Sequence, residues 1–258
     1  MTTLLDFLAT EMTRPIAYQG LESSWFQYLT LLVWLSLIVY TWYLSKHYHE
    51  EKATKAIFYV GLILLAFEIY KQVVFTYEAA SFQWYAFPFQ FCSTPMYIMI
   101  IQRFTRGRTK KALWMYLQTY GFFAGVAVMF YPVAVFHKMI GINIQTMVHH
   151  GAMSLVGFYL VLHAKPKIQN FLDASFIFLM LTMIAVIMNG SFNLFNHSAS
   201  FNMFFLNPKF QSHIPVISLF QAHVSSSIYI VIFIVGFSCI GYFMYLMSNL
   251  WHKSLRLK

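Results

Sequence analysis

Long apolar stretches, separated by short polar segments, make up most of the chain. A helix that crosses a bilayer needs about 20 mostly apolar residues. Seven stretches approach or reach that length, and they predict an all-α membrane helix bundle with seven transmembrane helices, forming a single polytopic domain over residues 1–258. The predicted helices are Trp25–Leu44, Ala56–Tyr77, Phe87–Gln102, Leu113–Phe136, Ile144–His163, Phe171–Asn193 and Ser226–Met247.

Two segments break this apolar pattern. Residues 1–24 mix acidic and basic side chains with leucines and lack the features of a cleaved signal peptide, so we expect a retained segment lying at the membrane interface. Residues 194–225 are too polar to span, yet they contain FNMFF and PVISLF. We expect this connection to be re-entrant or to lie on the outer surface.

The basic residues predict the orientation of the bundle. Thirteen of the 17 fall in loops on one side of the predicted helices, and the positive-inside rule places that side in the cytoplasm. The N-terminus is then outside and the C-terminus inside. The thirteen residues are Lys46, Lys52, Lys55, Arg103, Arg106, Arg108, Lys110, Lys111, Lys165, Lys167, Lys253, Arg256 and Lys258.

Composition supports the same class of protein. The chain is 59% hydrophobic and 10% charged, whereas soluble domains carry about 25% charged residues. The net charge of +9 is distributed over short loops, which indicates topology and not a nucleic-acid surface. We therefore expect a multi-pass protein of the cell membrane whose partners are membrane lipids.

Ionisable and amide side chains cost free energy at membrane depth, so each one is a candidate for a functional role. In the second predicted helix, Glu68 and Lys71 are spaced to share one face, and an intrahelical salt bridge explains them as well as a site does. In the third, Gln90, Ser93, Thr94 and Tyr97 form a polar stripe with Cys92 beside it, between Pro88 and Pro95. A lone membrane cysteine is more often a small apolar filler than a nucleophile.

The later helices add histidines and asparagines. His150 lies in a row with Thr146 and Ser154, and His149 is about 100° away from it. Hydrogen-bonding contacts between helices, worth about 0.6 kcal/mol on average, are the alternative interpretation of each such residue. In the predicted orientation, however, these groups collect in the outer halves of the helices, which favours a polar cavity that opens outward beneath residues 194–225. The group comprises Glu68, Lys71, Gln90, Cys92, His149, His150, Asn189, Asn193, Gln221 and His223.

Several cofactor chemistries lack their motifs. The ten histidines form neither HxxxH nor HxxHH, and the two cysteines, Cys92 and Cys239, form no CxxC or zinc spacing. The last predicted helix has no lysine for a retinal Schiff base. We expect no metal and no cofactor.

From Glu68 to about Pro215 the chain resembles the YwaF-type bacterial integral membrane proteins, which are distantly similar to the eukaryotic phospholipid acyltransferase transmembrane protein 164. The resemblance rests first on Glu68 and on the motif PFQFC, where the family has proline, an apolar residue, His or Gln, an apolar residue and Cys. It continues in His150-Gly151, in Asn189 and in FNMFFLNP, whose Asn202 and Pro208 match the family pattern.

The resemblance implies acyl transfer between phospholipids. Cys92 would be the nucleophile and His150 the general base, Glu68 or Asn189 would orient the base, and Gln90 would donate to an oxyanion. Thr94, Lys71, His149, Asn193, Asn202 and His223 are the expected substrate-binding residues. The alternatives are a non-enzymatic carrier or binding protein for a lipid or small solute, and a structural subunit.

Overall fold

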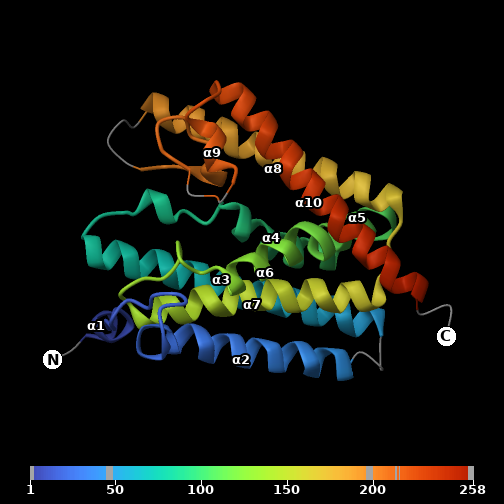
Figure 1. Ribbon diagram of the computed structural model, residues 1–258, viewed down its shortest axis with the longest axis horizontal. Helices are drawn as coiled ribbons and strands as arrows, with labels where there is room; N and C mark the ends of the chain where they lie inside the picture. The colour runs from blue at the N-terminus through green and yellow to red at the C-terminus, as the bar shows by residue number, and fades with distance from the viewer. Residues whose placement is uncertain (1–2, 45–48, 196–199, 213, 215, 255–258) are drawn as a thin grey trace.

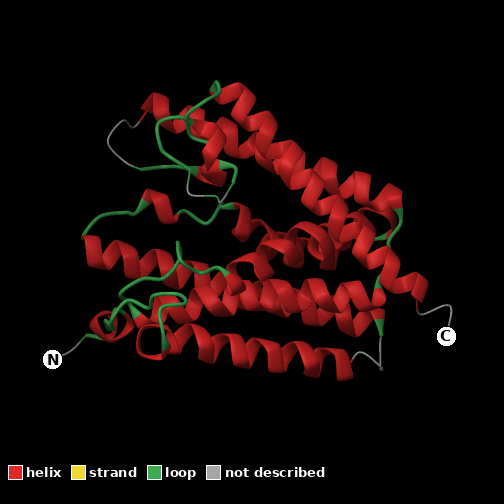
Figure 2. Ribbon diagram, in the orientation of Figure 1, coloured by secondary structure: helices red, strands yellow, loops and turns green. Residues whose placement is uncertain are grey.

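The computed structural model describes residues 3–44, 49–195, 200–212, 214 and 216–254 (Figure 1). Within these residues it consists of helices and loops without strands (Figure 2), which confirms the predicted all-α class. The helices are α1 (Leu4–Leu8), α2 (Leu21–Leu44), α3 (Glu50–Ala79), α4 (Thr94–Ile101), α5 (Gly107–Tyr116), α6 (Phe122–Phe130), α7 (Ile140–His163), α8 (Ile168–Phe195), α9 (Ser218–Gln221) and α10 (Ser226–Ser254).

The long helices run roughly alongside one another in a layered bundle (Figure 1). α2, α3 and α7 form one side, α8 and α10 form the other, and α4, α5 and α6 lie between them. The N-terminal segment and the connections after α3, α6 and α8 collect at one end of the bundle, which we call the N-terminal end. The chain leaves α10 at the opposite end, near the connection from α4 to α5.

Among the described residues, five helical segments are long and apolar enough to cross a membrane, and they correspond to the first, second, fourth, sixth and seventh predicted spans. The outer faces of α2, α3, α8 and α10 expose large apolar side chains, such as Leu32 on α2, Ile187 on α8 and Phe243 on α10, whereas Gly107–Phe130 is mostly buried. Such faces suit lipid contact. The segments are Leu21–Tyr43, Glu50–Ala79, Gly107–Phe130, Ile168–Phe195 and Ser226–Ser254.

α7 is a long helix of a different kind. It packs against α2, α3 and α6, and most of its polar residues are buried, including Asn143, Gln145 and Ser154. A helix surrounded by protein can carry such groups because neighbouring side chains satisfy them. This explains why α7 is less apolar than the lipid-facing helices.

The third predicted span is α-helical only in its second half, which corrects the expectation of a continuous helix over Phe87–Gln102. Gln90 has an extended backbone, a short 3₁₀ turn covers Phe91–Ser93, and the α-helix α4 begins only at Thr94. Pro95 occupies the first turn of α4, where a missing N–H costs nothing. Gln90 therefore does not belong to the predicted helical stripe.

The fourth predicted span ends earlier than expected and contains an irregular turn. A π-helical turn, Leu117–Gly121, joins α5 to α6, and α6 ends at Phe130 instead of Phe136. Pro132 explains the early end, because it lacks a backbone donor and disfavours a helical conformation at the preceding Tyr131.

The expected interfacial segment 1–24 is tied to the N-terminal end of the bundle. The backbone N–H of Met12 donates to the carbonyl of Lys138 at 2.6 Å, and Ile140 donates to Thr10 at 3.1 Å. The Lys138 ammonium lies 2.6 Å from carboxylate oxygens of both Glu11 and Glu78, and these contacts raise the pKa of Lys138 above its ordinary value. On α1, large apolar side chains are exposed next to this network.

The connection from α8 to α10 is part buried and part exposed. Phe201, Met203, Phe204 and Leu206 are at most 3% exposed and join the main apolar core, whereas α9 has no buried residue. The first part enters the bundle in the manner of a re-entrant segment. Of this connection, residues 196–199, 213 and 215 lie outside the described residues.

Candidate functional site

Glu68 is the centre of a buried polar cluster, the Glu68 cluster, formed by α3, α7 and the turn before α4. Its side chain is 4% exposed and accepts hydrogen bonds at 2.7 Å from the Lys71 ammonium and at 3.1 Å from the Gln145 amide. The Ser93 hydroxyl lies 3.4 Å from the same carboxylate. A carboxylate at this depth is stable only with such partners, so the cluster satisfies a charge that would otherwise be expensive.

His149 lies between Glu68 and Cys92. Its Nε2 is 3.1 Å from the carbonyl oxygen of Cys92, and its Nδ1 is 3.6 Å from Oε1 of Glu68. Because a carbonyl oxygen can only accept, Nε2 carries a proton in this arrangement. The ring is 2% exposed, and the Cys92 carbonyl sets its tautomer, because Nδ1 is buried without a hydrogen-bond partner among the described residues.

His150 occupies a different place. Its Nδ1 donates to the carbonyl of Thr146 on the same helix at 2.8 Å, which leaves the lone pair on Nε2. Nε2 is buried and has no hydrogen-bond partner among the residues that the structure describes. The two histidine rings are 5.6 Å apart between centroids.

Cys92 is a free, partly buried cysteine in the 3₁₀ turn before α4. Its carbonyl, and not its thiol, contacts His149. Within the described part of the chain, no hydrogen bond joins the thiol to either histidine ring. The structure thus brings the backbone of Cys92, the ring of His149 and the carboxylate of Glu68 together.

Gln90 and Asn189 belong to a second arrangement, which we call the amide clamp. The Gln90 amide donates to the carbonyl of Asn202 at 2.9 Å and accepts from the N–H of Phe204 at 3.0 Å. Asn189 does the same for both backbone groups of Met203, at 2.9 and 2.8 Å. Both side chains hold the buried part of the α8–α10 connection.

Two further asparagine contacts extend the amide clamp. Asn193 and Asn207 exchange side-chain hydrogen bonds at 3.0 and 3.1 Å, and Oδ1 of Asn202 accepts from the N–H of Asn207 at 2.9 Å. The predicted substrate-binding residues Asn193 and Asn202 are therefore engaged in holding this segment.

The clamped segment has an unusual backbone. Phe204 and Phe205 both have φ of 57°, a left-handed conformation that costs non-glycine residues of order 1–2 kcal/mol each. Gln90 and Asn189 supply the hydrogen bonds that offset this cost. The strained segment packs directly on the turn that carries Cys92, since the rings of Phe91 and Phe204 are in edge contact at 5.8 Å.

Asn189→Ala is expected to destabilise the fold by about 1–3 kcal/mol, because it leaves the N–H of Met203 buried without a partner, whereas the carbonyl of Met203 keeps the hydrogen bond from the N–H of Leu206 at 3.2 Å. Thermal unfolding of the purified variant should show the lower stability, and hydrogen exchange should rise over residues 201–207. Gln169→Ala, an exposed amide on the same helix, is the control and should behave like wild type. Unchanged exchange in Asn189→Ala would contradict the amide clamp.

The remaining predicted residues lie apart from the Glu68 cluster. Thr94 is fully buried, and its hydroxyl is 2.7 Å from the Tyr116 hydroxyl and donates to the carbonyl of Phe91. His223 is exposed in the turn after α9, and no described contact joins it to Glu68. Among the described residues, no hydrogen bond joins Thr94 or His223 to Cys92.

The sequence-based prediction of the site did not include Gln145, which binds Glu68, or Asn207, which completes the amide clamp. Gln145 lies one helical turn before His149, so their i, i+4 spacing could have placed both on the face toward α3. Nothing in the local pattern around Asn207 indicates its partner, because the contact joins residues 14 positions apart across a loop. No group of three metal-ligating side chains occurs among the described residues.

Comparison with known proteins gives one match. The sequence model of the TMEM164 family matches residues 20–248, which include the Glu68 cluster and the amide clamp. No curated protein and no solved structure matches the chain. The predicted relation to transmembrane protein 164 is confirmed, whereas the YwaF-type designation stays a prediction. The chain is an integral, multi-pass membrane protein that belongs to the TMEM164 family.

Proposed function

We propose that the chain is a phospholipid acyltransferase in which Cys92 is the nucleophile, His149 the general base and Glu68 the residue that orients the base. The observation that carries this proposal is the position of His149, with Nδ1 toward the Glu68 carboxylate and Nε2 toward Cys92. With the proton moved to Nδ1 and the Cys92 thiol turned toward Nε2, this order of carboxylate, imidazole and thiol is the one that activates a thiol. We assign the role to His149 and not to His150 because the described contacts place the ring of His149 between Glu68 and Cys92.

The reaction takes place in two displacements. A shift of the imidazole proton to Nδ1, from which Glu68 accepts a hydrogen bond, frees Nε2 to take the proton of the Cys92 thiol. The thiolate attacks the carbonyl carbon of a phospholipid ester, the ester C–O bond breaks, and the departing lipid alkoxide takes the proton from His149. A hydroxyl of a second lipid then attacks the thioester, gives its proton to His149, and releases the Cys92 thiolate with a new ester.

Gln90 and Asn189 are positioning residues in this proposal. Both amides are bound to the re-entrant segment, so they hold that segment against the Cys92 turn instead of meeting the substrate. Glu68, His149 and His150 are at most 7% exposed, and a lipid ester therefore needs an opening to reach them. We place that opening under the strained segment at the N-terminal end.

Cys92→Ser should abolish the remodelling of acyl chains while leaving the protein in the membrane. Lipid analysis of cells that express wild type or Cys92→Ser compares the acyl-chain profiles directly. Cys239→Ser is the matched control, because Cys239 is exposed on α10, and it should give the wild-type profile. Identical profiles from wild type and Cys92→Ser would contradict the proposal.

A non-covalent carrier for a lipid or small solute is the second candidate, favoured by the buried Glu68–Lys71 pair at the centre of the cluster. The two candidate functions differ in whether they need the charge of Glu68 or the thiol of Cys92. Loss of transport in Glu68→Gln together with full function in Cys92→Ala would support carriage and exclude the acyl-enzyme.

We further propose seven crossings of the cell membrane, with the N-terminus outside and the N-terminal end of the bundle at the extracytoplasmic leaflet. The two crossings beyond the five apolar segments are α7 and the segment from Phe87 to Phe104, whose helix α4 packs on α3. The orientation rests on the basic loops. Four residues used in the sequence-based predictions lie outside the described residues: Lys46, Arg256, Lys258 and Pro215.

A membrane-impermeant maleimide tests this topology in a Cys92→Ala/Cys239→Ala background. A cysteine at Ser81 should react in intact cells, whereas cysteines at Thr109 and Lys165 should react only after permeabilisation; all three sites are exposed. Labelling of Ser81→Cys and Thr109→Cys from the same side would contradict the crossing between them.

A further inference from the structure

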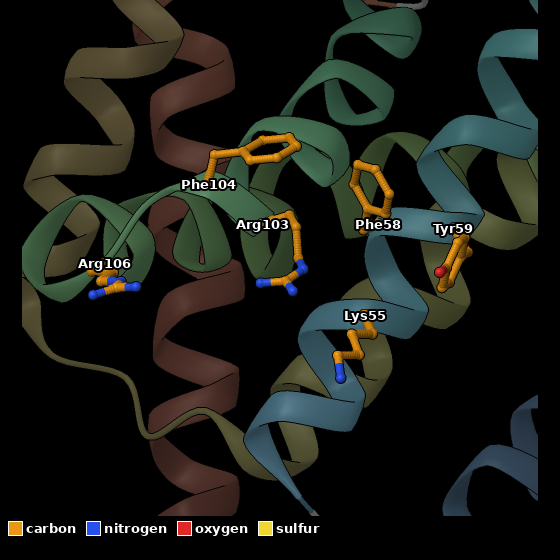
Figure 3. A pocket seen from close by; sticks show the side chains of 6 residues that line it. All are labelled: Lys55, Phe58, Tyr59, Arg103, Phe104 and Arg106. Carbon is orange, nitrogen blue, oxygen red and sulfur yellow. The ribbon is translucent and has the colours of Figure 1, made fainter.

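A basic pocket lies at the end of the bundle opposite the N-terminal end. Its volume is about 520 Å³, and Figure 3 shows the side chains around it, which come from α3 and from the segment between α4 and α5. Lys55 is 13 residues before Glu68 on α3, a distance of about 20 Å along the helix. The pocket is therefore separate from the Glu68 cluster. Its lining residues are Lys55, Phe58, Tyr59, Arg103, Phe104 and Arg106.

Two of its three cations are available for a ligand. Arg103 and Arg106 are exposed, and neither guanidinium forms a hydrogen bond or a salt bridge with any residue that the structure describes, although Arg103 interacts electrostatically with the exposed Glu51. Lys55 is paired with Glu51 at 2.8 Å, on the surface. Other cations nearby are engaged, since Arg108 binds Asp173 and Lys110 binds Glu50. Two unpaired guanidinium groups suit a phosphate, whose oxygens accept their fork of N–H donors.

The same pocket adjoins an apolar surface. Phe104 is 75% exposed and Tyr59 is 61% exposed, and the ring of Phe104 is in edge contact with that of Phe58 at 5.7 Å. One turn further along α3, Leu62 and Ile63 are also exposed. Exposed aromatic rings between cations and an apolar helix face are typical of the membrane interface. A ligand here meets positive charge at one end and apolar surface at the other.

We propose that this pocket binds the phosphate headgroup of an anionic glycerophospholipid, with Arg103 and Arg106 on the phosphate and Tyr59 and Phe104 against the acyl chains. A free phosphate shares the charged half of this chemistry but makes no use of the apolar half. Basic pockets between membrane helices commonly hold anionic lipid headgroups. The proposal does not depend on acyl transfer, because the pocket and the Glu68 cluster are at different ends of α3.

Native mass spectrometry of the detergent-purified full chain, titrated with phosphatidylglycerol or phosphatidylcholine, tests the assignment. Arg103→Gln/Arg106→Gln should weaken phosphatidylglycerol binding about thirty-fold, and it should weaken phosphatidylcholine binding less, because the choline cation neutralises the charge of that headgroup. Lys111→Gln/Lys253→Gln removes the same charge from exposed positions that do not line the pocket, and it should alter phosphatidylglycerol binding less than about threefold. Thermal unfolding of both double variants should match wild type, because all four side chains are exposed.

Three results would overturn the proposal. The first is equal phosphatidylglycerol binding by wild type and Arg103→Gln/Arg106→Gln. The second is an equal loss in Lys111→Gln/Lys253→Gln, which would mean general attraction to a basic surface. The third is displacement of phosphatidylglycerol by a moderate excess of inorganic phosphate, which would assign the pocket to free phosphate. Retention of phosphatidylglycerol in excess inorganic phosphate supports the lipid.

Discussion

Replacing His149 with glutamine is expected to lower the rate of acyl transfer by a factor of about 10² to 10⁴, the usual contribution of a general base. The side chain of glutamine can still donate to the carbonyl of Cys92, as Nε2 of His149 does at 3.1 Å, but it cannot accept the thiol proton. The fold should therefore persist while the chemistry stops. The measurement is the turnover of a fluorescent-acyl phospholipid by purified protein in lipid nanodiscs.

His150→Gln is the matched control for this variant. Both histidines are buried neighbours on α7, but Nδ1 of His150 is bound to Thr146, and only His149 faces Glu68 and Cys92. We expect His150→Gln to retain activity within about tenfold of wild type. If His150→Gln were inactive and His149→Gln active, the base assigned here would be wrong and the His150 assignment from sequence would be restored.

Replacing Gly125 with alanine is expected to destabilise the bundle by about 3 kcal/mol or more. A Cβ at this position of α6 would meet the carbonyl oxygen of His150 at 2.6 Å and the N–H nitrogen of Ser154 at 2.7 Å. Both are backbone atoms of α7, so the contact cannot be relieved by a side-chain rotation. Small residues permit such close approach between membrane helices. Thermal unfolding in detergent should show a decrease of about 10 °C.

Gly190→Ala is the control for Gly125→Ala. A Cβ at Gly190 meets no atom within 4 Å, and the higher helix propensity of alanine should leave the stability unchanged or raise it by up to about 1 kcal/mol. Gly151→Ala should also be tolerated, because its Cβ would meet only the side chains of Trp34 and Met129 at 3.6 Å or more. Equal unfolding temperatures for Gly125→Ala and wild type would contradict the tight crossing of α6 and α7.

The lipid-facing helices were predictable because their physical signal is local. About 20 apolar residues in a row indicate a span whatever surrounds them, and α2, α3, α8 and α10 lie within a few residues of their predicted positions, apart from the longer ends of α3 and α10. The stretch from Phe87 was misassigned because an apolar run does not distinguish a helix from an extended segment held by protein. The two prolines were the available signal, and Pro95 marks the start of α4 instead of a bend within a helix.

The site was only partly predictable because its contacts join distant parts of the chain. Glu68, Lys71, Cys92 and His149 were each identified as polar groups at membrane depth, and the structure brings them together. Their partners depend on side-chain direction, which no sequence pattern fixes: Nδ1 of His150 turns back to its own helix, and Gln90 and Asn189 reach the backbone of residues 202–204. The amide clamp could not be foreseen because its acceptors and donors are main-chain groups of a loop.

The most direct test of the acyl-enzyme is the intact mass of the protein after incubation with a phospholipid of defined acyl chain. We expect the mass of the protein to increase by one acyl group, located on the Cys92 peptide. Neutral hydroxylamine should remove this group, and Cys92→Ala should not acquire it. We also expect a decrease in the rate of this acylation in His149→Gln. An unmodified protein that nevertheless remodels the lipid, or an acyl group on Cys239 alone, would contradict the central claim that Cys92 carries the acyl chain.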